Sequence, residues 1–390
     1  MKESPSCKLN RRAGLIILAV VAFGMLAAAC GGSDNSTSST ASEAPKEGGA
    51  STEAKEGSTN NAKAGAVDVG TGSPIPLKVE DIKLAYVAAG LNVPLGVLSK
   101  ELLEELTAEY GISLKTFDPQ LDPARQFQLY ETVVDSGNYN AIITLPLGGE
   151  QDCQILSEKA PAKGIVVAVT VNSICGREFE SPAGNGLWSP GTLVTSGVST
   201  NLQGLEAWAS ACEKETGGGE AIVLNGTAGT PNNQALTKGI ENGSKVDIVA
   251  NYATNYTGEE ALEKTSAGLL AHPGAHLIMS TYPPLTEGAI VALKSAGKTP
   301  GKDVKLCSFT GGTENMLNLV RSGELAVDTY VNYVWTTKNA FEAIIMAAEG
   351  KSVPRVIVPS TTGEITKAGV EPWPPAYTKA TVEQFEPNGE

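Results

Sequence analysis

The chain has 390 residues with 43 acidic and 29 basic side chains, which gives a net charge of −14. Its length allows one large domain or two medium domains, each with a core of its own. This excess of acidic over basic side chains excludes a general nucleic-acid-binding protein, which would need a basic surface. Only two histidines are present, His272 and His276, and this argues against a histidine-built metal site or histidine-based catalysis.

The first 29 residues have the pattern of a signal peptide that is removed on export. Four basic residues lie among the first twelve: Lys2, Lys8, Arg11 and Arg12. An apolar run over 13–29 follows and ends in Leu-Ala-Ala-Ala directly before Cys30. This ending resembles the bacterial lipobox, so we predict cleavage before Cys30 and lipidation of its thiol. The alternative is an ordinary signal peptide, or an N-terminal anchor helix, with an incidental cysteine.

Residues 30–75 are predicted to form a flexible tether. From Gly31 to Gly72 the sequence consists mainly of small, polar and charged residues, with almost no large apolar side chain. Such a stretch buries too little surface to offset its chain entropy. We therefore expect the folded part of the chain to begin near residue 76.

Short apolar runs then alternate with amphipathic segments. We expect strands at 82–87, 113–117, 141–145 and 164–169, and helices at 94–110, 123–136 and 153–162. Continuous apolar strands that alternate with helices indicate a parallel sheet covered on both faces.

The alternation repeats in the second half of the chain. Helices are expected at 202–215, 233–242, 259–270, 284–296, 314–322 and 335–350, with strands at 221–224, 246–250, 276–279, 304–309 and 326–331. Two rounds of this pattern predict an α/β fold with two doubly wound parallel-sheet lobes.

Five segments occur in a characteristic order and spacing. They are Asp122-Pro123-Ala124-Arg125-Gln126, Lys163-Gly164-Ile165-Val166-Val167, Asn225-Gly226-Thr227-Ala228-Gly229-Thr230, Gly288-Ala289-Ile290-Val291-Ala292-Leu293 and Arg321-Ser322-Gly323-Glu324-Leu325. With these segments the chain resembles the type I periplasmic substrate-binding proteins, the ribose-binding-protein-like group that supplies ABC importers. The resemblance covers about residues 80–350.

The resemblance implies two lobes joined by a three-strand hinge, with the ligand enclosed between the lobes. Hinges are expected near 194–199, near 331–333 and beyond residue 354. The implied N-terminal lobe comprises 76–193 with about 332–352, and the C-terminal lobe comprises 194–331. Residues 353–390 form the hinge return and a proline-rich tail. The tail is expected to lack regular structure. It either packs across the hinge or a lobe, or is disordered.

Loops at the carboxyl ends of strands form the binding crevice of such sheets. They supply the candidate ligand-binding residues, with Trp188 added from a long loop before the first hinge: Asn92, Asn172, Trp188, Asn232, Asn233, Gln234, Tyr282, Thr310, Asn332 and Trp335. Asn232 and Asn233 could instead cap a helix, and Trp335 could instead belong to the core, without contact to a ligand.

Charged residues that sugar-binding members of the resembled family carry are replaced in this chain. Gln234 and Lys238 lie in the region of an expected arginine, Tyr282-Pro283 replaces Asn-Asp, and Thr310 replaces the aspartate of Phe-Asp-Gly. We therefore favour a small neutral ligand, sugar-like or aromatic, over one held by charged bidentate hydrogen bonds.

Four cysteines remain after the signal peptide and Cys30. Cys153 and Cys175 lie at the same edge of the first expected sheet, so we predict a disulfide between them. Cys212 and Cys307 are left either as a second disulfide or as buried thiols. No Cys-x-x-Cys segment occurs, and neither a metal nor another cofactor is expected.

These features together predict a lipid-anchored, extracytoplasmic solute-binding protein that delivers a small molecule to the permease and ATPase subunits of an ABC importer. We expect a monomer that touches the cell membrane through the lipid on Cys30 and binds no nucleic acid. No set of nucleophile, base and orienting residue supports an enzyme. The alternative function is a ligand-binding sensor that presents its closed form to a membrane receptor.

Overall fold

The computed structural model describes residues 59–61, 63–181, 183–197, 201–357 and 375–387. The predicted signal peptide, Cys30 and the predicted tether up to residue 58 lie outside these residues, as does 358–374 of the tail. Among the described residues, no helix combines the length and the apolar character that crossing a membrane requires.

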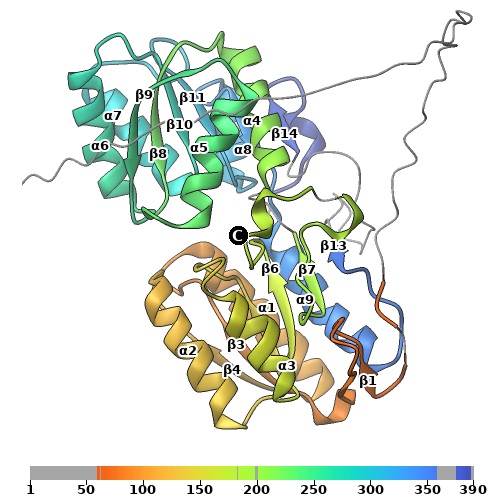
Figure 1. Cartoon of the computed structure of the whole chain (residues 1–390). Helices are drawn as coiled ribbons and strands as arrows, with labels where there is room; N and C mark the ends of the chain where they lie inside the picture. Colours follow the sequence, from red (N-terminus) through yellow and green to blue (C-terminus); the bar gives the residue numbers. More distant parts are fainter. Residues whose placement is uncertain (1–58, 62, 182, 198–200, 358–374, 388–390) are drawn as a thin grey trace, which may run out of the picture. The chain divides into compact units, whose positions relative to one another are not determined.

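A six-stranded parallel sheet forms the first lobe, in the order β13-β7-β6-β5-β3-β4. Its strands are β3 (Lys83–Val87), β4 (Ser113–Phe117), β5 (Ala141–Thr144), β6 (Val166–Thr170), β7 (Val194–Ser196) and β13 (Val356–Ile357). The central strands β5 and β6 are buried along their whole length, because helices cover both faces of the sheet (Figure 1).

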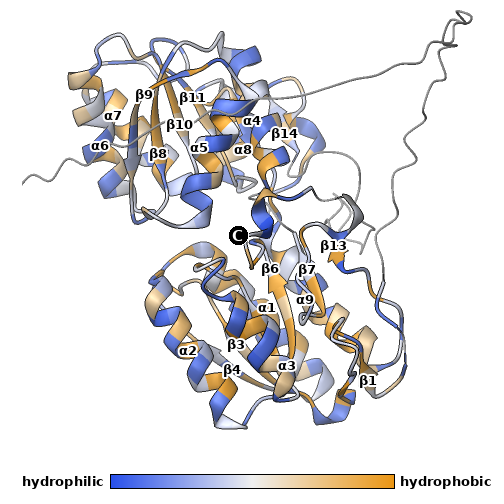
Figure 2. Ribbon diagram, in the orientation of Figure 1, coloured by the Kyte–Doolittle hydropathy of each residue, from blue (hydrophilic) through white to orange (hydrophobic). Residues whose placement is uncertain are grey.

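Alternate residues of β3 face two separate cores. Leu84 and Tyr86 pack with α1 (Pro94–Tyr110) and α9 (Tyr333–Ala348). Ala85 and Val87 pack instead with α2 (Pro123–Ser136) and the π-helical turn η2 (Gln154–Lys159). This two-residue period is why the strand is a nearly continuous apolar run, and Figure 2 shows the central strand β6 largely in the orange of hydrophobic residues.

A second six-stranded sheet forms the second lobe, in the order β14-β12-β11-β10-β8-β9. Its strands are β8 (Glu220–Asn225), β9 (Asp247–Ala253), β10 (Leu277–Ser280), β11 (Lys305–Ser308), β12 (Val327–Thr329) and β14 (Ala376–Thr378). All neighbours are parallel except β14, which pairs antiparallel with β12.

Helices again cover both faces of this sheet. One core contains side chains of α4 (Leu202–Thr216) and α5 (Pro231–Gly243). The other contains side chains of α6 (Gly258–Ala271), α7 (Pro283–Ser295) and α8 (Glu314–Ser322). The predicted α/β fold with two doubly wound sheets is therefore confirmed.

Short polar side chains fix where several helices begin. Asp122 accepts hydrogen bonds from the backbone N–H groups of Ala124 and Arg125, ahead of Pro123 at the first helical position of α2. Thr230 and Asn332 cap α5 and α9 in the same way. Such caps satisfy backbone donors that a helix start leaves without partners, and they place each helix directly after the loop that follows a strand.

The tether prediction is wrong for the described residues 59–61 and 63–75. Asn60 exchanges hydrogen bonds with Val353, and the strands β1 (Ala66–Val67) and β2 (Ile75–Pro76) pair as a hairpin. Val67 and Val69 are fully buried in the first lobe. A few apolar side chains are enough to hold this polar segment in place, because they pack beside α9.

The segment expected to be a helix at 153–162 is instead mostly π-helical. η2 continues into α3 (Ala160–Ala162), which contains Pro161. Proline lacks the N–H that a regular α-helix would use at this position, which favours a locally widened turn.

The chain passes between the sheets at three places, but the lobe boundaries differ from the prediction. The passages follow β7, follow β12 on the way to α9, and lie between β13 and β14. Strand β7 belongs to the first sheet, so the boundary predicted at residue 193 falls one strand too early. The tail also contains regular structure: β14 joins the second sheet, and the buried Tyr377 donates a hydrogen bond to Asp328 Oδ2 over 2.6 Å.

Two disulfides reinforce the lobes. Cys153 is bonded to Cys175, as predicted, and both residues lie in the first lobe. Cys212 of α4 is bonded to Cys307 of β11, which resolves the alternative that the sequence left open in favour of a second disulfide.

Candidate functional site

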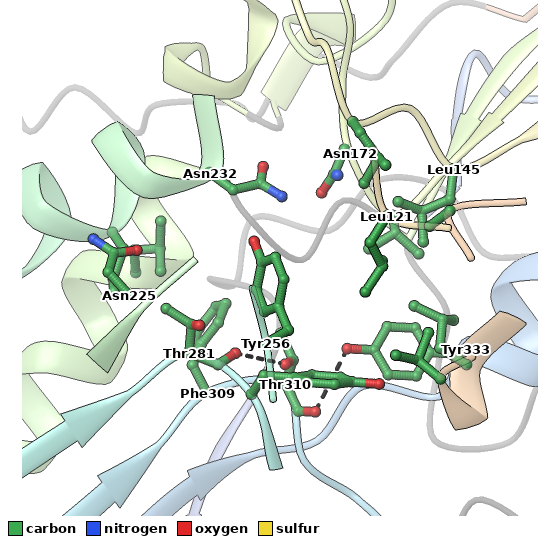
Figure 3. A pocket seen from close by; sticks show the side chains of 18 residues that line it. Leu121, Leu145, Asn172, Asn225, Asn232, Tyr256, Thr281, Phe309, Thr310 and Tyr333 are labelled. Atoms are coloured by element: carbon green, nitrogen blue, oxygen red, sulfur yellow. Dashed lines mark hydrogen bonds between the residues drawn. The ribbon is translucent and has the colours of Figure 1, made fainter. Parts of the chain in front are cut away.

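A pocket lies at the carboxyl ends of strands from both sheets (Figure 3). It has a volume of about 90 Å³, several times the roughly 15 Å³ that one buried water needs. Parallel sheets place their ligands at this edge, because the loops that follow the strands converge there.

Loops of the first lobe supply a mainly aliphatic wall. Leu121 follows β4, Leu145 and Leu147 follow β5, and Val171 and Asn172 follow β6. The Asn172 amide donates a hydrogen bond to the carbonyl oxygen of Pro146 over 2.8 Å. This bond ties the loop after β6 to the loop after β5.

Loops of the second lobe supply the aromatic wall. Tyr256 follows β9, Tyr282 follows β10 and Phe309 follows β11. The rings of Tyr256 and Tyr282 meet edge to face, with centroids 5.8 Å apart and planes at 87°. This is a favourable aromatic arrangement, and it fixes two ring surfaces against the pocket.

A short chain of hydrogen bonds supports the floor of the pocket. The Thr310 hydroxyl donates to the carbonyl oxygen of Thr281 over 2.8 Å, and the Thr310 N–H donates to Thr329 Oγ1. The Tyr333 hydroxyl donates to the carbonyl oxygen of Thr310 over 3.5 Å. Tyr333 opens α9, so this bond joins the second lobe's loop to the helix that returns to the first lobe.

The pocket wall carries no net charge. None of its 18 lining residues is Asp, Glu, Lys, Arg or His. Burial raises the pKa of the Tyr256 hydroxyl to about 12, opposed in part by hydrogen bonds from Asn232 and from the Thr227 backbone. Burial also raises the pKa of the Tyr282 and Tyr333 hydroxyls. All three tyrosines are therefore neutral at physiological pH.

Strained backbone is concentrated at this pocket. Seven described non-glycine residues have a positive φ, and four of them line the pocket: Leu121 (62°), Val171 (63°), Tyr256 (63°) and Thr310 (63°). This conformation is disfavoured for L-residues, above all β-branched ones, and costs of the order of 1–3 kcal/mol per residue. Strain of this kind gathers at functional sites, where the surrounding structure holds a side chain in a required direction.

Close approach explains one glycine of the site. A Cβ atom on Gly226 would lie 2.0 Å from the Tyr256 hydroxyl oxygen. Glycine at this position therefore leaves room for the ring of Tyr256 above the end of β8.

Four of the ten predicted ligand-binding residues line the pocket: Asn172, Asn232, Tyr282 and Thr310. The other six lie elsewhere. Asn92 and Gln234 are exposed. Asn233 donates its amide to the carbonyl oxygen of Gly226, and Asn332 caps α9 by accepting from the Trp335 N–H. Both asparagines thus serve local backbone structure.

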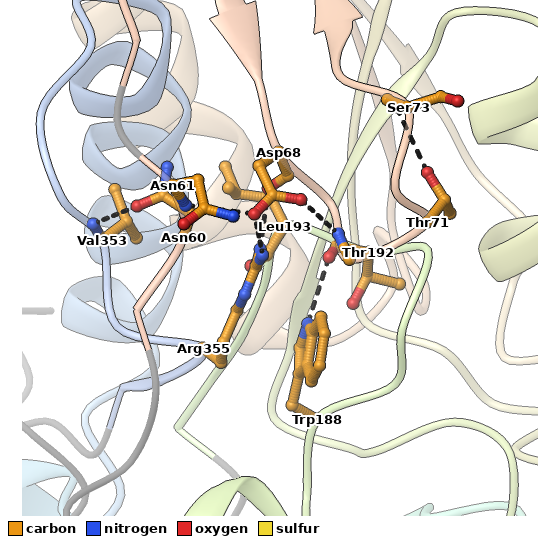
Figure 4. A network of polar contacts seen from close by, with 11 residues as sticks. Asn60, Asn61, Asp68, Thr71, Ser73, Trp188, Thr192, Leu193, Val353 and Arg355 are labelled. Carbon is orange, nitrogen blue, oxygen red and sulfur yellow. Dashed lines mark hydrogen bonds and ion pairs between the residues drawn. The ribbon is translucent and has the colours of Figure 1, made fainter.

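The two predicted tryptophans also have structural partners. Trp335 packs beside the Tyr330 ring in a core of the second lobe. Trp188 lies over the Arg355 guanidinium, 4.6 Å from the ring centroid, and its indole N–H donates to the carbonyl oxygen of Thr192. Arg355 is buried and forms an ion pair with Asp68 over 3.0 Å (Figure 4).

This network gives Trp188 a role in the first lobe instead of in the pocket. Arg355 also donates hydrogen bonds to the carbonyl oxygens of Asp68 and Leu193. The guanidinium therefore joins the segment before β2, the start of β7 and the segment that leads into β13.

Sequence reasoning missed most of the aromatic and aliphatic wall. Tyr256, Phe309 and Tyr333 were not among the candidates, and neither were the six leucines of the wall: Leu95, Leu121, Leu145, Leu147, Leu205 and Leu236. Position after a strand was a usable signal for Tyr256. The strand before Tyr256 was expected to end at residue 250 but runs to Ala253, so Tyr256 lies closer to the end of the strand than the apolar pattern indicated.

This fold and this pocket define the class of the protein: a ligand-binding protein built of two α/β lobes. Its pocket holds neutral side chains from both sheets, and among the described residues no three His, Cys, Asp or Glu side chains gather in a way that could hold a metal ion.

The chain belongs to the periplasmic binding protein domain family, whose model matches residues 96–352. It is similar to the ribose import binding protein RbsB of Salmonella typhimurium, with 23% identity over 247 residues that cover 62% of this chain and 77% of the relative. This is a family of binding proteins and not of enzymes, which confirms the non-enzymatic prediction.

Solved structures share the fold. A galactofuranose binding protein is similar with a TM-score of 0.63 and 17% identity, covering 78% of this chain and 96% of that one. A Caulobacter myo-inositol binding protein, solved with myo-inositol, has a TM-score of 0.62 and 18% identity, covering 78% and 95%.

Proposed function

We propose that this chain is a lipid-anchored, extracytoplasmic solute-binding protein that captures a small neutral molecule and delivers it to an ABC importer. The observation that carries the proposal is an uncharged pocket lined by loops of both sheets. A ligand in that pocket would contact both lobes at once. Binding would therefore favour the arrangement that holds the lobes around the ligand.

The comparisons support the transport role. A relative whose length is matched over 77% is named as a ribose import binding protein. Two proteins of similar fold are named for the binding of galactofuranose and of myo-inositol. Each of those names refers to a neutral molecule, in keeping with a pocket that lacks charged side chains.

The lipid anchor rests on the sequence before Cys30. A basic start, an apolar run and small residues before a cysteine occur together there. This pattern supports export and attachment to the outer face of the cell membrane.

Thermal unfolding of the purified protein tests ligand capture. A panel of sugars, polyols, nucleosides and aromatic compounds should contain members that raise the melting temperature, because a ligand that binds only the folded state stabilises it. Failure of every member to raise it would contradict the binding role. Loss of uptake of the same compound in cells that lack this chain would support delivery to an importer.

A further inference from the structure

The N-terminus of α1 lacks a capping side chain of its own. Val93 occupies its N-cap position and makes no side-chain hydrogen bond to the helix. By contrast, an Asp, Asn or Thr side chain caps the starts of α2, α4, α5, α6, α8 and α9. A helix start leaves backbone donors without partners unless a group outside the helix accepts from them. The start of α1 therefore needs another acceptor.

Most of the first turn of α1 is satisfied within the turn itself. Pro94 at the first helical position has no N–H to satisfy. The N–H groups of Gly96 and Val97 donate to the carbonyl oxygen of Val93 over 3.1 and 3.3 Å. The N–H of Leu95 has no backbone acceptor among the described residues. This N–H is therefore left for a side chain or for water.

The hydroxyl of Tyr282 accepts this hydrogen bond from the other lobe. Tyr282 follows β10 of the second sheet. Burial raises the pKa of its hydroxyl, and a hydrogen bond from the Leu95 backbone works against that rise. A bond that lowers the pKa of a phenol comes from a donor, and the backbone donor is the N–H. Tyr282 and Leu95 also line the same pocket, so a side chain of the second lobe caps a helix of the first.

Apolar contacts join the same two elements. Val93 is only 9% exposed and belongs to the hydrophobic cluster of the second lobe that contains Tyr282 and Leu285. Valine is a poor N-cap residue, and burial against the second lobe explains why it occupies this position. The ring of Tyr282 is held in turn by its edge-to-face contact with Tyr256. The second lobe therefore meets both the polar and the apolar requirements of this helix start.

We propose that Tyr282 is a positioning residue for ligand capture, whose hydroxyl caps α1 only while the two lobes are closed on one another. Separation of the lobes would break this bond and expose Val93 to water. The bond and the apolar contact would thus add to the ligand's own contacts in favouring the closed arrangement. This inference rests on the proposed function, since it concerns how capture at the same pocket is coupled to closure. It is compatible with a sugar as the ligand.

Hydrogen exchange of the Leu95 amide tests the cap directly. Tyr282→Phe keeps the aromatic ring and removes the hydroxyl. In purified protein carrying isotope-labelled leucine, this change should speed exchange of the Leu95 amide about five- to tenfold, because the amide loses its acceptor. NMR measures the rate without ligand and with D-ribose.

Tyr330→Phe is the matched control for this measurement. Tyr330 belongs to the same hydrophobic cluster as Tyr282, and its hydroxyl accepts a hydrogen bond from the Asn332 amide. It does not line the pocket. Its substitution removes a hydroxyl from the same core and should leave the exchange rate of Leu95 unchanged.

A second substitution separates a cap from a direct contact with the ligand. Val93→Thr has nearly the same shape and supplies the local cap that α1 lacks, because a threonine hydroxyl at the N-cap accepts from the amides of the first turn. In the wild-type background, Tyr282→Phe should weaken D-ribose about fivefold in titration calorimetry. In the Val93→Thr background it should change neither this affinity nor the exchange of Leu95. An equal loss of affinity in both backgrounds would assign the hydroxyl to the ligand and overturn the capping role.

The outcomes distinguish this inference from the function on which it rests. An unchanged Leu95 exchange rate in Tyr282→Phe would overturn the cap and leave the solute-binding role intact. If D-ribose does not bind, the exchange rates without ligand decide the inference, and the wider panel described above decides the binding role. If Val93→Thr fails to fold, the comparison of Tyr282→Phe with Tyr330→Phe decides.

Discussion

At the scale of single residues, the sequence predicts which positions lie at the pocket better than it predicts where their side chains point. Asn172, Tyr282 and Thr310 could be predicted as pocket residues because each follows a strand that the apolar pattern locates. The direction of a side chain in a loop could not be predicted in the same way. A left-handed residue such as Val171 turns the chain abruptly, and only the packed structure selects that conformation.

Asp152 illustrates a residue-scale effect on stability. Its carboxylate is buried after β5 and accepts a hydrogen bond from the Gly148 N–H over 2.9 Å. Burial raises its pKa from 3.8 to about 7, despite that bond. The folded state therefore holds the proton more tightly than the unfolded state between pH 4 and pH 7, so this residue's contribution to stability falls as the pH rises across that range.

We predict that Asp152→Asn removes this pH dependence. From pH 4 to pH 7 the wild type should lose roughly a few kcal/mol of unfolding free energy relative to the variant, as measured by urea unfolding at each pH. Asp135→Asn is the control, because Lys163 lowers the pKa of that exposed carboxyl and its effect has the opposite sign. Parallel curves for wild type and Asp152→Asn would contradict the prediction.

Trp188 allows a test that separates structure from ligand binding. Trp188→Leu removes the ring that covers the Arg355 guanidinium, and should lower the unfolding free energy by about 2 kcal/mol through lost burial and lost cation–π attraction. The affinity for a pocket ligand should stay unchanged. Tyr282→Leu should instead weaken the ligand, and titration calorimetry on both variants distinguishes the two effects.

At the scale of helices and strands, long elements were predictable and short ones were not. The central strands are continuous apolar runs, and the helices between them have caps and amphipathic spacing. Strands β1 and β2 have two residues each, too few to show a period. Strand β14 forms because it pairs with β12 and buries Tyr377, contacts that no local pattern of a proline-rich tail reveals.

The two disulfides should contribute unequally to stability. The bond between Cys212 and Cys307 spans 95 residues, and that between Cys153 and Cys175 spans 22. Closing a longer loop restricts the unfolded chain more, which gives about 5 kcal/mol against about 3 kcal/mol. Replacing each pair by alanine and measuring denaturant midpoints should show the larger loss for Cys212 and Cys307. An equal or reversed order would contradict the loop-entropy explanation.

At the scale of the whole molecule, attachment to the membrane is predicted to depend on acyl chains. The net charge of −14 gives no electrostatic attraction to an anionic bilayer, and stable anchoring then needs buried hydrocarbon. Cys30→Ser should move the protein from the membrane fraction to the soluble fraction and abolish labelling by radioactive palmitate. Cys7→Ser is the control and should leave both unchanged. Continued palmitate labelling of Cys30→Ser would contradict lipidation at this residue.

Each of the two disulfides closes within one lobe, and neither spans the passages between the sheets. Each bond restrains the unfolded chain of its own lobe, and neither would restrict the movement of one lobe against the other that the proposed function requires. Placing both covalent links inside the lobes thus separates the stability of each lobe from the movement that ligand capture is proposed to need.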